Sequence, residues 1–218
     1  MKINDHCLKE LTIENSALLM VDYQVGINFN YGTQTNLKFS NVAQELVKSA
    51  KNFNIPILIS DSYPQGQDVY TINWLSNLCL NQKVYHRNSV LDAFSYKPFA
   101  DAIAALGRKK LILIGVTEEL CAVFPVRTAI KLGYEVILCY DIAGAADKMD
   151  MIATILRVQQ MGAIVAPGYS IAANWQKNST LPAVTGLSNN FSEPLVNYEF
   201  VVQSKQGMTK APNGGFHS

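Results

Sequence analysis

Short apolar runs alternate with segments of helical periodicity about six times between residues 16 and 166. The first run, residues 16–22, is apolar from Ala17 until it ends in Asp22. A strand that helices cover on both faces has this composition, because neither face meets water. Further strands are expected at residues 55–60, 83–86, 111–115, 134–140 and 163–166. This α/β alternation predicts a three-layer αβα sandwich around a six-stranded, mainly parallel, doubly wound sheet.

Helices are expected between these strands, because apolar residues recur there at spacings of three and four. The four clearest segments begin near Val42, Phe99, Ala122 and Met149. Residues 1–175 are therefore expected to form one domain. From Asn178 the composition becomes polar, so residues 176–218 are expected to be a C-terminal extension. We expect this extension to serve as an oligomerisation arm that is partly disordered at its end.

The composition favours a large core and a subunit interface. Charged residues make up 16% of the chain, against the ~25% of an average globular protein. Apolar residues also persist outside the expected core, and they include Trp74, Leu75 and Trp175. Burial in a homo-oligomer is the common solution for such a surface. The net charge is +1, so we expect no nucleic-acid partner, because nothing would neutralise a phosphate backbone.

The chain lacks the usual signals for membranes, disulfides and cofactors. No apolar run approaches the ~20 residues of a membrane helix, and the four cysteines form no CxxC pair. We therefore expect a cytoplasmic protein that does not bind membranes. GxGxxG, phosphate-loop, GxSxG and HExxH motifs are all absent. The only histidines are His6, His86 and His217. No cofactor or metal is expected, and the chemistry should use a cysteine, acids and a cation.

Cys121 stands between a buried strand that ends at Gly115 and a helix. Proline at position 125 clashes with the carbonyl four residues earlier in a helix, so Cys121 is expected at the helix start. A thiol there feels the positive end of the helix dipole, and free N–H groups nearby can hold an oxyanion. The alternative is a buried structural cysteine, which is how we interpret Cys7, Cys79 and Cys139.

Possible partners for a thiol nucleophile follow other strands. Asp22 ends the first strand, which lies next to the fourth in a doubly wound sheet, so its carboxylate is expected to face Cys121. Arg87 follows the short third strand and can supply a cation, while His86 is a candidate base. Two structural alternatives stay open: Asp22 could cap a loop, and Arg87 could pair with a surface acid.

At these residues the chain resembles the isochorismatase-like cysteine hydrolases over roughly residues 14–175. The segment from Ala17 to Gln24 resembles the family's first-strand block, and Gly115–Cys121 resembles its nucleophile loop. The segments Gly133–Val136 and Asp141–Gly144 match the strand and turn that follow. Cys121–Pro125 and Asn88–Phe94 are most similar to the YcaC-type branch.

The resemblance implies a parallel six-stranded αβα fold and an Asp, Lys and Cys triad. Asp22 takes the position of the base and Cys121 that of the nucleophile, while Arg87 occupies the lysine position, as in the YcaC-type branch. A cis peptide is implied at Val116–Thr117, with the N–H groups of Thr117 and Cys121 as the oxyanion hole. Large assemblies in this branch lead us to expect a tetramer or an octamer.

Two differences from other branches narrow the expected chemistry. Metal-binding nicotinamidases carry Asp-x-His after the second strand, whereas this chain has Asp61-Ser-Tyr63. Isochorismatases proper lack the cysteine, so Cys121 argues against hydrolysis of a vinyl ether. We expect a metal-independent hydrolase that cleaves an amide or related C–N bond of a small molecule through a thioester. Expected substrate-binding residues are Tyr23, Gln24, Phe29, Tyr63, Phe94 and Phe124.

Two other functional classes compete with this prediction. A non-catalytic binding or scaffold protein on the same fold could also carry a reactive thiol at Cys121, and turnover on a panel of amides would separate it from a hydrolase. A nucleotide-binding oxidoreductase is disfavoured because the glycine fingerprint is absent.

Overall fold

The computed structural model of the chain describes residues 10–24, 36–62, 71–116 and 118–177, and all structural statements refer to these residues. Several sequence-based predictions lie outside this part of the chain. They are the roles of Cys7, Phe29, Tyr63 and Thr117, and the extension from residue 178 onward.

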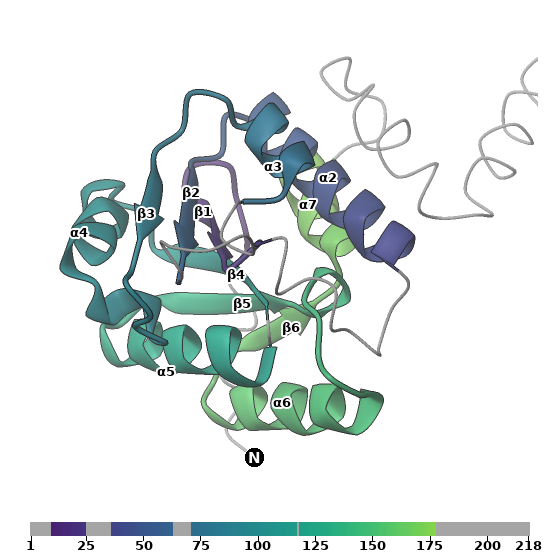
Figure 1. Cartoon of the computed structure of the whole chain (residues 1–218). Coiled ribbons are helices and arrows are strands. Elements are labelled where there is room, and N and C mark those ends of the chain that lie inside the picture. Colours follow the sequence, from purple (N-terminus) through teal and green to yellow (C-terminus); the bar gives the residue numbers. More distant parts are fainter. Residues whose placement is uncertain (1–9, 25–35, 63–70, 117, 178–218) are drawn as a thin grey trace, which may run out of the picture.

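A six-stranded sheet forms the centre of the molecule (Figure 1). Its strands, in chain order, are β1 (Ser16–Val21), β2 (Ile57–Asp61), β3 (Val84–His86), β4 (Lys110–Gly115), β5 (Glu135–Cys139) and β6 (Ile164–Ala166). The spatial order is β3-β2-β1-β4-β5-β6, and every pair of neighbours is parallel. The chain moves outward from β1 to β3 and then returns to β4. The direction of winding therefore reverses between β1 and β4, where ligands bind in doubly wound sheets.

Helices cover both faces of the sheet. The helices are α2 (Asn36–Asn52), α3 (Asn73–Leu78), α4 (Lys97–Ala105), α5 (Val123–Lys131), α6 (Lys148–Gln160) and α7 (Gly168–Gln176). Helices α2, α3 and α7 pack on one face, and α4, α5 and α6 pack on the other (Figure 1). Alternate residues of β1 follow this division, since Leu18 and Met20 contact the first group, and Leu19 and Val21 contact the second. All six residues of β1 are buried, which explains the continuous apolar run.

The predicted αβα sandwich with its six strands is confirmed, and every strand pairing is parallel. Helices α3 and α7 were not predicted, and α3 is a short helix of six residues. The placement of Leu75 and Trp175 outside the core was wrong. Both are buried within the chain, and the Trp175 indole N–H donates to Ser16 Oγ at 3.0 Å. Trp74 is partly buried against the same core. No helix among the described residues is long and apolar enough to cross a membrane.

Candidate active site

Asp22 follows the last residue of β1 and adopts a left-handed backbone conformation, with φ of 61°. Few residue types other than glycine accept this conformation, and aspartate and asparagine are among them. The Asp22 N–H donates to the Ser60 carbonyl at 2.8 Å, which holds the end of β1 against β2. The Asp22 side chain is fully buried. The turn therefore directs a carboxylate into the protein at the point where the sheet reverses its winding.

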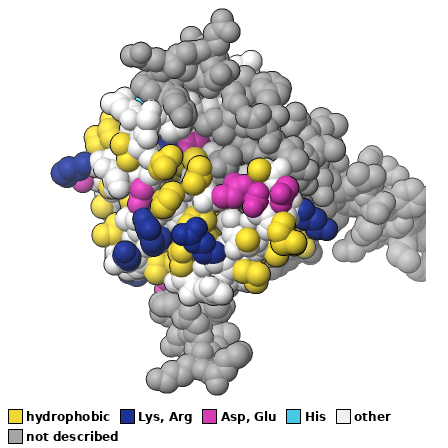
Figure 2. All heavy atoms as spheres, turned by 60° about the horizontal axis from the view of Figure 1, so that its bottom comes forward, with side chains coloured by type: hydrophobic (Ala, Val, Ile, Leu, Met, Phe, Trp, Pro, Cys, Tyr) yellow, Lys and Arg dark blue, Asp and Glu magenta, His cyan; other side chains and the backbone are white. Residues whose placement is uncertain are grey.

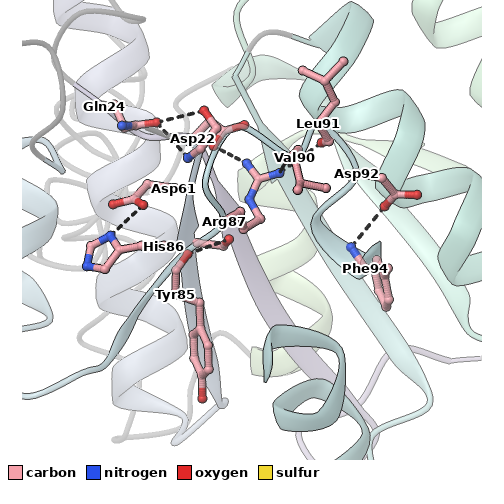
Figure 3. Close-up of polar contacts among 12 residues, drawn as sticks. Asp22, Gln24, Asp61, Tyr85, His86, Arg87, Val90, Leu91, Asp92 and Phe94 are labelled. Atoms are coloured by element: carbon pink, nitrogen blue, oxygen red, sulfur yellow. Dashed lines mark hydrogen bonds and ion pairs between the residues drawn. The ribbon is translucent and has the colours of Figure 1, made fainter. Parts of the chain in front are cut away.

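Arg87 supplies the counter-charge for this carboxylate (Figure 3). Its side chain is also fully buried, and its Nη2 donates to Asp22 Oδ1. Nη1 donates to the carbonyls of Val90 at 2.5 Å and Leu91 at 3.0 Å, so the loop after β3 wraps around the guanidinium. Asn88 at the start of this loop has positive φ, which turns the chain back toward Arg87. The sequence had left open a surface partner for Arg87, and the structure pairs it with buried Asp22.

The pair is not saturated with hydrogen bonds. Asp22 Oδ2 and Arg87 Nε are both buried and have no partner among the described residues. A buried polar atom without a partner is costly in free energy and is uncommon in folded proteins. One carboxylate oxygen of Asp22 is therefore held by arginine, and the other can still accept a proton or a hydrogen bond.

Cys121 lies in η3 (Glu118–Ala122), a π-helical turn that leads directly into α5. The expected position at the start of a helix is thus close to the observed one, with Ala122 as the N-cap of α5. The thiol is 7% exposed and belongs to the core cluster that contains Val21. Single π-helical turns occur frequently at functional sites.

Gly115, at the end of β4, allows this turn to fold back onto the strand. A Cβ atom at position 115 would lie 2.8 Å from the Cys121 carbonyl oxygen and 2.9 Å from the Ala122 nitrogen. Gly115 is also the register partner of Val21, the residue before Asp22. Two neighbouring strands therefore bring Asp22 and Cys121 to the same edge of the sheet.

Two acidic side chains brace the segments around Cys121. Glu119 Oε1 accepts from the Ala146 N–H at 2.9 Å, which connects η3 to the loop before α6. Asp92 accepts from the Phe94 N–H at 3.0 Å and from the Thr128 hydroxyl at 2.6 Å. The loop that holds Arg87 is thereby fixed to α5. Sequence reasoning missed both acids, although Asp92 falls in a segment that resembles the YcaC-type branch.

The predicted substrate-binding residues within the described part of the chain fall into two groups. Tyr23 is buried, donates its hydroxyl proton to the Ile142 carbonyl and meets Trp74 edge to face. Gln24 is buried, and its Oε1 accepts from the Ser62 N–H and hydroxyl at 3.1 and 3.2 Å. The Gln24 contacts hold the chain after β1 against the chain after β2, whereas the Tyr23 contacts reach Ile142 after β5 and Trp74 in α3, so both side chains have a role within the fold.

The two aromatic residues on the other side of the sheet lie closer to Cys121. Phe94 is 7% exposed and belongs to the same core cluster as Cys121. Phe124 is partly buried in the first turn of α5, three residues after Cys121, and the Arg127 guanidinium lies 5.1 Å from its ring centre. Of the predicted substrate-binding residues that the structure describes, these two fit best a wall beside the thiol.

A second acid–base pair, Asp61 and His86, is formed by the last residues of β2 and β3 (Figure 3). His86 Nδ1 lies 2.7 Å from Asp61 Oδ1, and the imidazole is 58% exposed. Burial raises the pKa of the Asp61 carboxyl, and the hydrogen bond to His86 opposes this rise. The pair occupies the carboxyl edge of the sheet, on the face that α2 and α3 cover. Its imidazole is held by Asp61 and is not part of the Asp22–Arg87 contact.

Among the described residues, no group of three or more histidine, cysteine, aspartate or glutamate side chains could hold a metal ion. The prediction of a metal-independent site concerns the whole chain and stays a prediction. A groove of about 230 Å³ opens at the opposite edge of the sheet, where Gly133 and Met161 contribute to its wall. This groove lies beside the amino ends of β5 and β6, away from Asp22 and Cys121.

The chain matches a family model, the isochorismatase domain, over residues 16–168. It is 26% identical over 200 residues to the probable hydrolase YcaC of Escherichia coli (strain K12), which covers 90% of this chain and 94% of the relative. The crystal structure of E. coli YcaC, described as an octameric hydrolase of unknown specificity, superposes with a TM-score of 0.85 at 26% identity. That match covers 91% of this chain and 97% of the other.

A further solved structure, YcaC from Pseudomonas aeruginosa with hexane-2,5-diol and covalent acrylamide, superposes with a TM-score of 0.86. The identity is 24%, and the match covers 91% of this chain and 98% of the other, so the likeness is one of fold.

Proposed function

Because this chain belongs to the isochorismatase family and is one of its hydrolases, we propose that it cleaves an amide or related C–N bond of a small molecule. Cys121 is the nucleophile, Asp22 the base, and Arg87 the cation that keeps Asp22 ionised and in place. The observation that carries this proposal is the buried Asp22–Arg87 pair with a carboxylate oxygen still unpartnered among the described residues.

The first step forms a thioester. Asp22 accepts the thiol proton, the Cys121 sulfur attacks the carbonyl carbon, and the C–N bond breaks as the proton passes to the leaving amine. For a primary amide, thiol and amide become a thioester and ammonia. The N–H groups of Thr117 and Cys121 are proposed to hold the oxyanion. Thr117 lies outside the described residues.

The second step consumes water. Asp22 takes a proton from the water molecule, the resulting hydroxide attacks the thioester, and the sulfur leaves and is reprotonated. A carboxylic acid is released, and Cys121 returns to the thiol. The Asp22–Arg87 pair has no net charge in the resting protein. Proton transfer from Cys121 to Asp22 moves negative charge onto sulfur while Arg87 stays positive, so no net charge has to enter the buried site.

The covalent adduct in one compared structure bears on the reactivity of the site rather than on C–N cleavage. Acrylamide is a primary amide with three carbons, and it forms covalent bonds with nucleophiles. Its covalent presence on P. aeruginosa YcaC supports, for this chain, a reactive nucleophile in a site that admits a small amide. Phe94 and Phe124 are the proposed apolar walls for the acyl group. The octameric state of E. coli YcaC supports a homo-oligomer, which we propose to be a tetramer or an octamer.

A panel of small primary and secondary amides tests the proposal directly. Wild-type protein should release the amine and the acid in equal amounts, and EDTA should leave the rate unchanged. Cys121→Ala should abolish turnover, whereas Cys121→Ser, which keeps the volume of the side chain, should retain at most a trace. Rapid acid quench followed by intact-mass analysis should reveal an acyl adduct on the Cys121 peptide. Adducts without turnover over the whole panel would instead support a non-catalytic binding protein with a reactive thiol.

A further inference from the structure

The outward face of α6 carries an apolar stripe that nothing in the described part of the chain covers. Met149, Ile152 and Leu156 are 70%, 38% and 54% exposed. Their spacing of three and then four residues places them on one side of the helix. The opposite side of α6 carries Thr154 and Val158, which are buried against the sheet. Helix α6 therefore presents apolar side chains in two directions, and the sheet accounts for only one of them.

Figure 2 brings this side of the molecule forward, and exposed hydrophobic side chains lie there beside groups of acidic and basic side chains. Two charges on α6 have a particular arrangement. Asp150 lies in the first turn and Arg157 in the last turn, seven residues apart. Seven residues are nearly two full turns, so both charges stand on the same flank of the apolar stripe, about 10 Å apart along the axis. Neither side chain forms an ion pair with another described residue.

We propose that this face of α6 binds the same face of a second copy of the chain, with the two helices antiparallel about a two-fold axis. The axis passes between positions 153 and 154, midway between the two charges. Asp150 of each copy then meets Arg157 of the other, and the two apolar stripes face each other. The acid and the base lie on one flank at opposite ends of the helix. The two-fold axis therefore places the acid of each copy opposite the base of the other. An isologous interface requires such self-complementarity.

The occupant that we infer is a second copy, because an acid and a base on one flank of α6 complement themselves. The chain's own C-terminal extension, residues 178–218, is an alternative that the test distinguishes. The turn that holds Cys121 lies beside the proposed interface, because η3 contacts α6 and its Leu120 is 45% exposed. The inference rests on the homo-oligomer proposed above and names one of the contacts that build it.

Charge reversal tests the contact without disturbing the core, since all the residues involved are exposed. Light scattering on the full-length chain at low micromolar concentration gives the mass of the assembly. Asp150→Arg and Arg157→Asp should each lower this mass at least twofold, because each places like charges opposite one another twice. The double variant, Asp150→Arg with Arg157→Asp, should restore the wild-type mass. Ile152→Glu should also lower the mass, whereas Leu80→Glu, at a site 77% exposed elsewhere, should not.

Four results would overturn the inference. Single reversals that leave the mass unchanged would place the subunit contact elsewhere. Single reversals that lower the mass without recovery in the double variant would exclude the antiparallel register. Loss of mass in a full-length Phe191→Glu/Phe200→Glu variant, with the α6 variants unaffected, would assign assembly to the extension. A wild-type species of 24 kDa would remove the homo-oligomer and this contact together. Turnover on the amide panel is measured separately, so the proposed chemistry and the proposed interface are tested by different experiments.

Discussion

Arg87 donates to Asp22 at the carboxyl end of β1, and neither side chain is exposed to solvent. Removing two charges from water costs several kcal/mol for each ion, and well-packed apolar residues often replace such pairs without loss of stability. Stability alone is therefore a weak explanation for the pair. The proposed role of Asp22 as the base for Cys121 gives the pair a second explanation, which the variants below test.

Replacing Asp22 by asparagine should lower kcat by about 10²–10⁴-fold, the usual contribution of a general base. The chain should still fold, because asparagine has nearly the same shape and accepts the left-handed conformation at this position. The free energy of unfolding should nevertheless fall by about 3 kcal/mol, since Arg87 then keeps a buried charge without its counter-ion. Steady-state kinetics and urea denaturation measure the two effects.

Asp61→Asn is the matched control, because Asp61 is also a buried acid at the end of a strand and is paired with a basic side chain. This variant should retain turnover within about tenfold of wild type. Near-native kcat in the Asp22→Asn variant would rule out the role of Asp22 as the base.

Two variants at Arg87 separate the effect of its charge from the effect of its shape. Arg87→Met removes the charge at similar volume and leaves Asp22 buried and unpaired, so the free energy of unfolding should fall by about 3–5 kcal/mol. Arg87→Lys keeps a cation that can reach Asp22, but it loses the planar geometry that also serves the Val90 and Leu91 carbonyls. It should remain folded, with a smaller loss of stability and measurable turnover. Equal stability of the methionine variant and wild type would show that the charge of Arg87 does not stabilise the fold through Asp22.

Gly115→Ala tests the close approach between β4 and the nucleophile turn. The added methyl group would lie within 2.9 Å of backbone atoms of Cys121 and Ala122, which cannot rotate away. Overpacking of this kind costs about 1–3 kcal/mol, and here it should also move Cys121 and lower kcat. Gly107→Ala is the control, because the space around Gly107 is open and only its positive φ of 63° opposes the change. That variant should lose about 1 kcal/mol and keep its kcat.

Thiol labelling compares the cysteines. Burial raises the pKa of the Cys79 thiol, and Lys51 only partly opposes this. Cys79 should therefore remain a protonated thiol up to and beyond the ordinary cysteine pKa of about 8.5, and it should react slowly below that pH. Iodoacetamide at pH 6 to 7, followed by peptide mapping, should label Cys121 first. Earlier labelling of Cys7 or Cys79 would contradict the assignment of the nucleophile.

The sequence was sufficient to predict the sheet and the edge at which the site forms. The carboxyl ends of parallel strands meet at one edge, so the positions of Asp22, Arg87 and Cys121 after three different strands already brought them together. The burial of Arg87 was not predictable, because it depends on a loop whose Asn88 and Ser89 both adopt positive φ. Neither residue type requires that conformation.

Contacts between residues far apart in the sequence also could not be predicted from local sequence patterns. Trp175 was expected outside the core. Its partner Ser16 is 159 positions away, and only the folded chain brings the indole N–H and that hydroxyl together. The exposure of the apolar stripe on α6 could not be predicted either. Its residues fit the helical pattern equally well whether they face the sheet or a second subunit.

The left-handed backbone at Asp22 limits which residues evolution can place there. Only glycine, asparagine and aspartate adopt this conformation at little cost, and of these three only aspartate can accept a proton from a thiol. A relative that has lost its hydrolytic activity can therefore keep the same fold most easily with asparagine or glycine at this position. On the proposed mechanism, aspartate at this turn is therefore the residue that a working enzyme of this architecture has to keep.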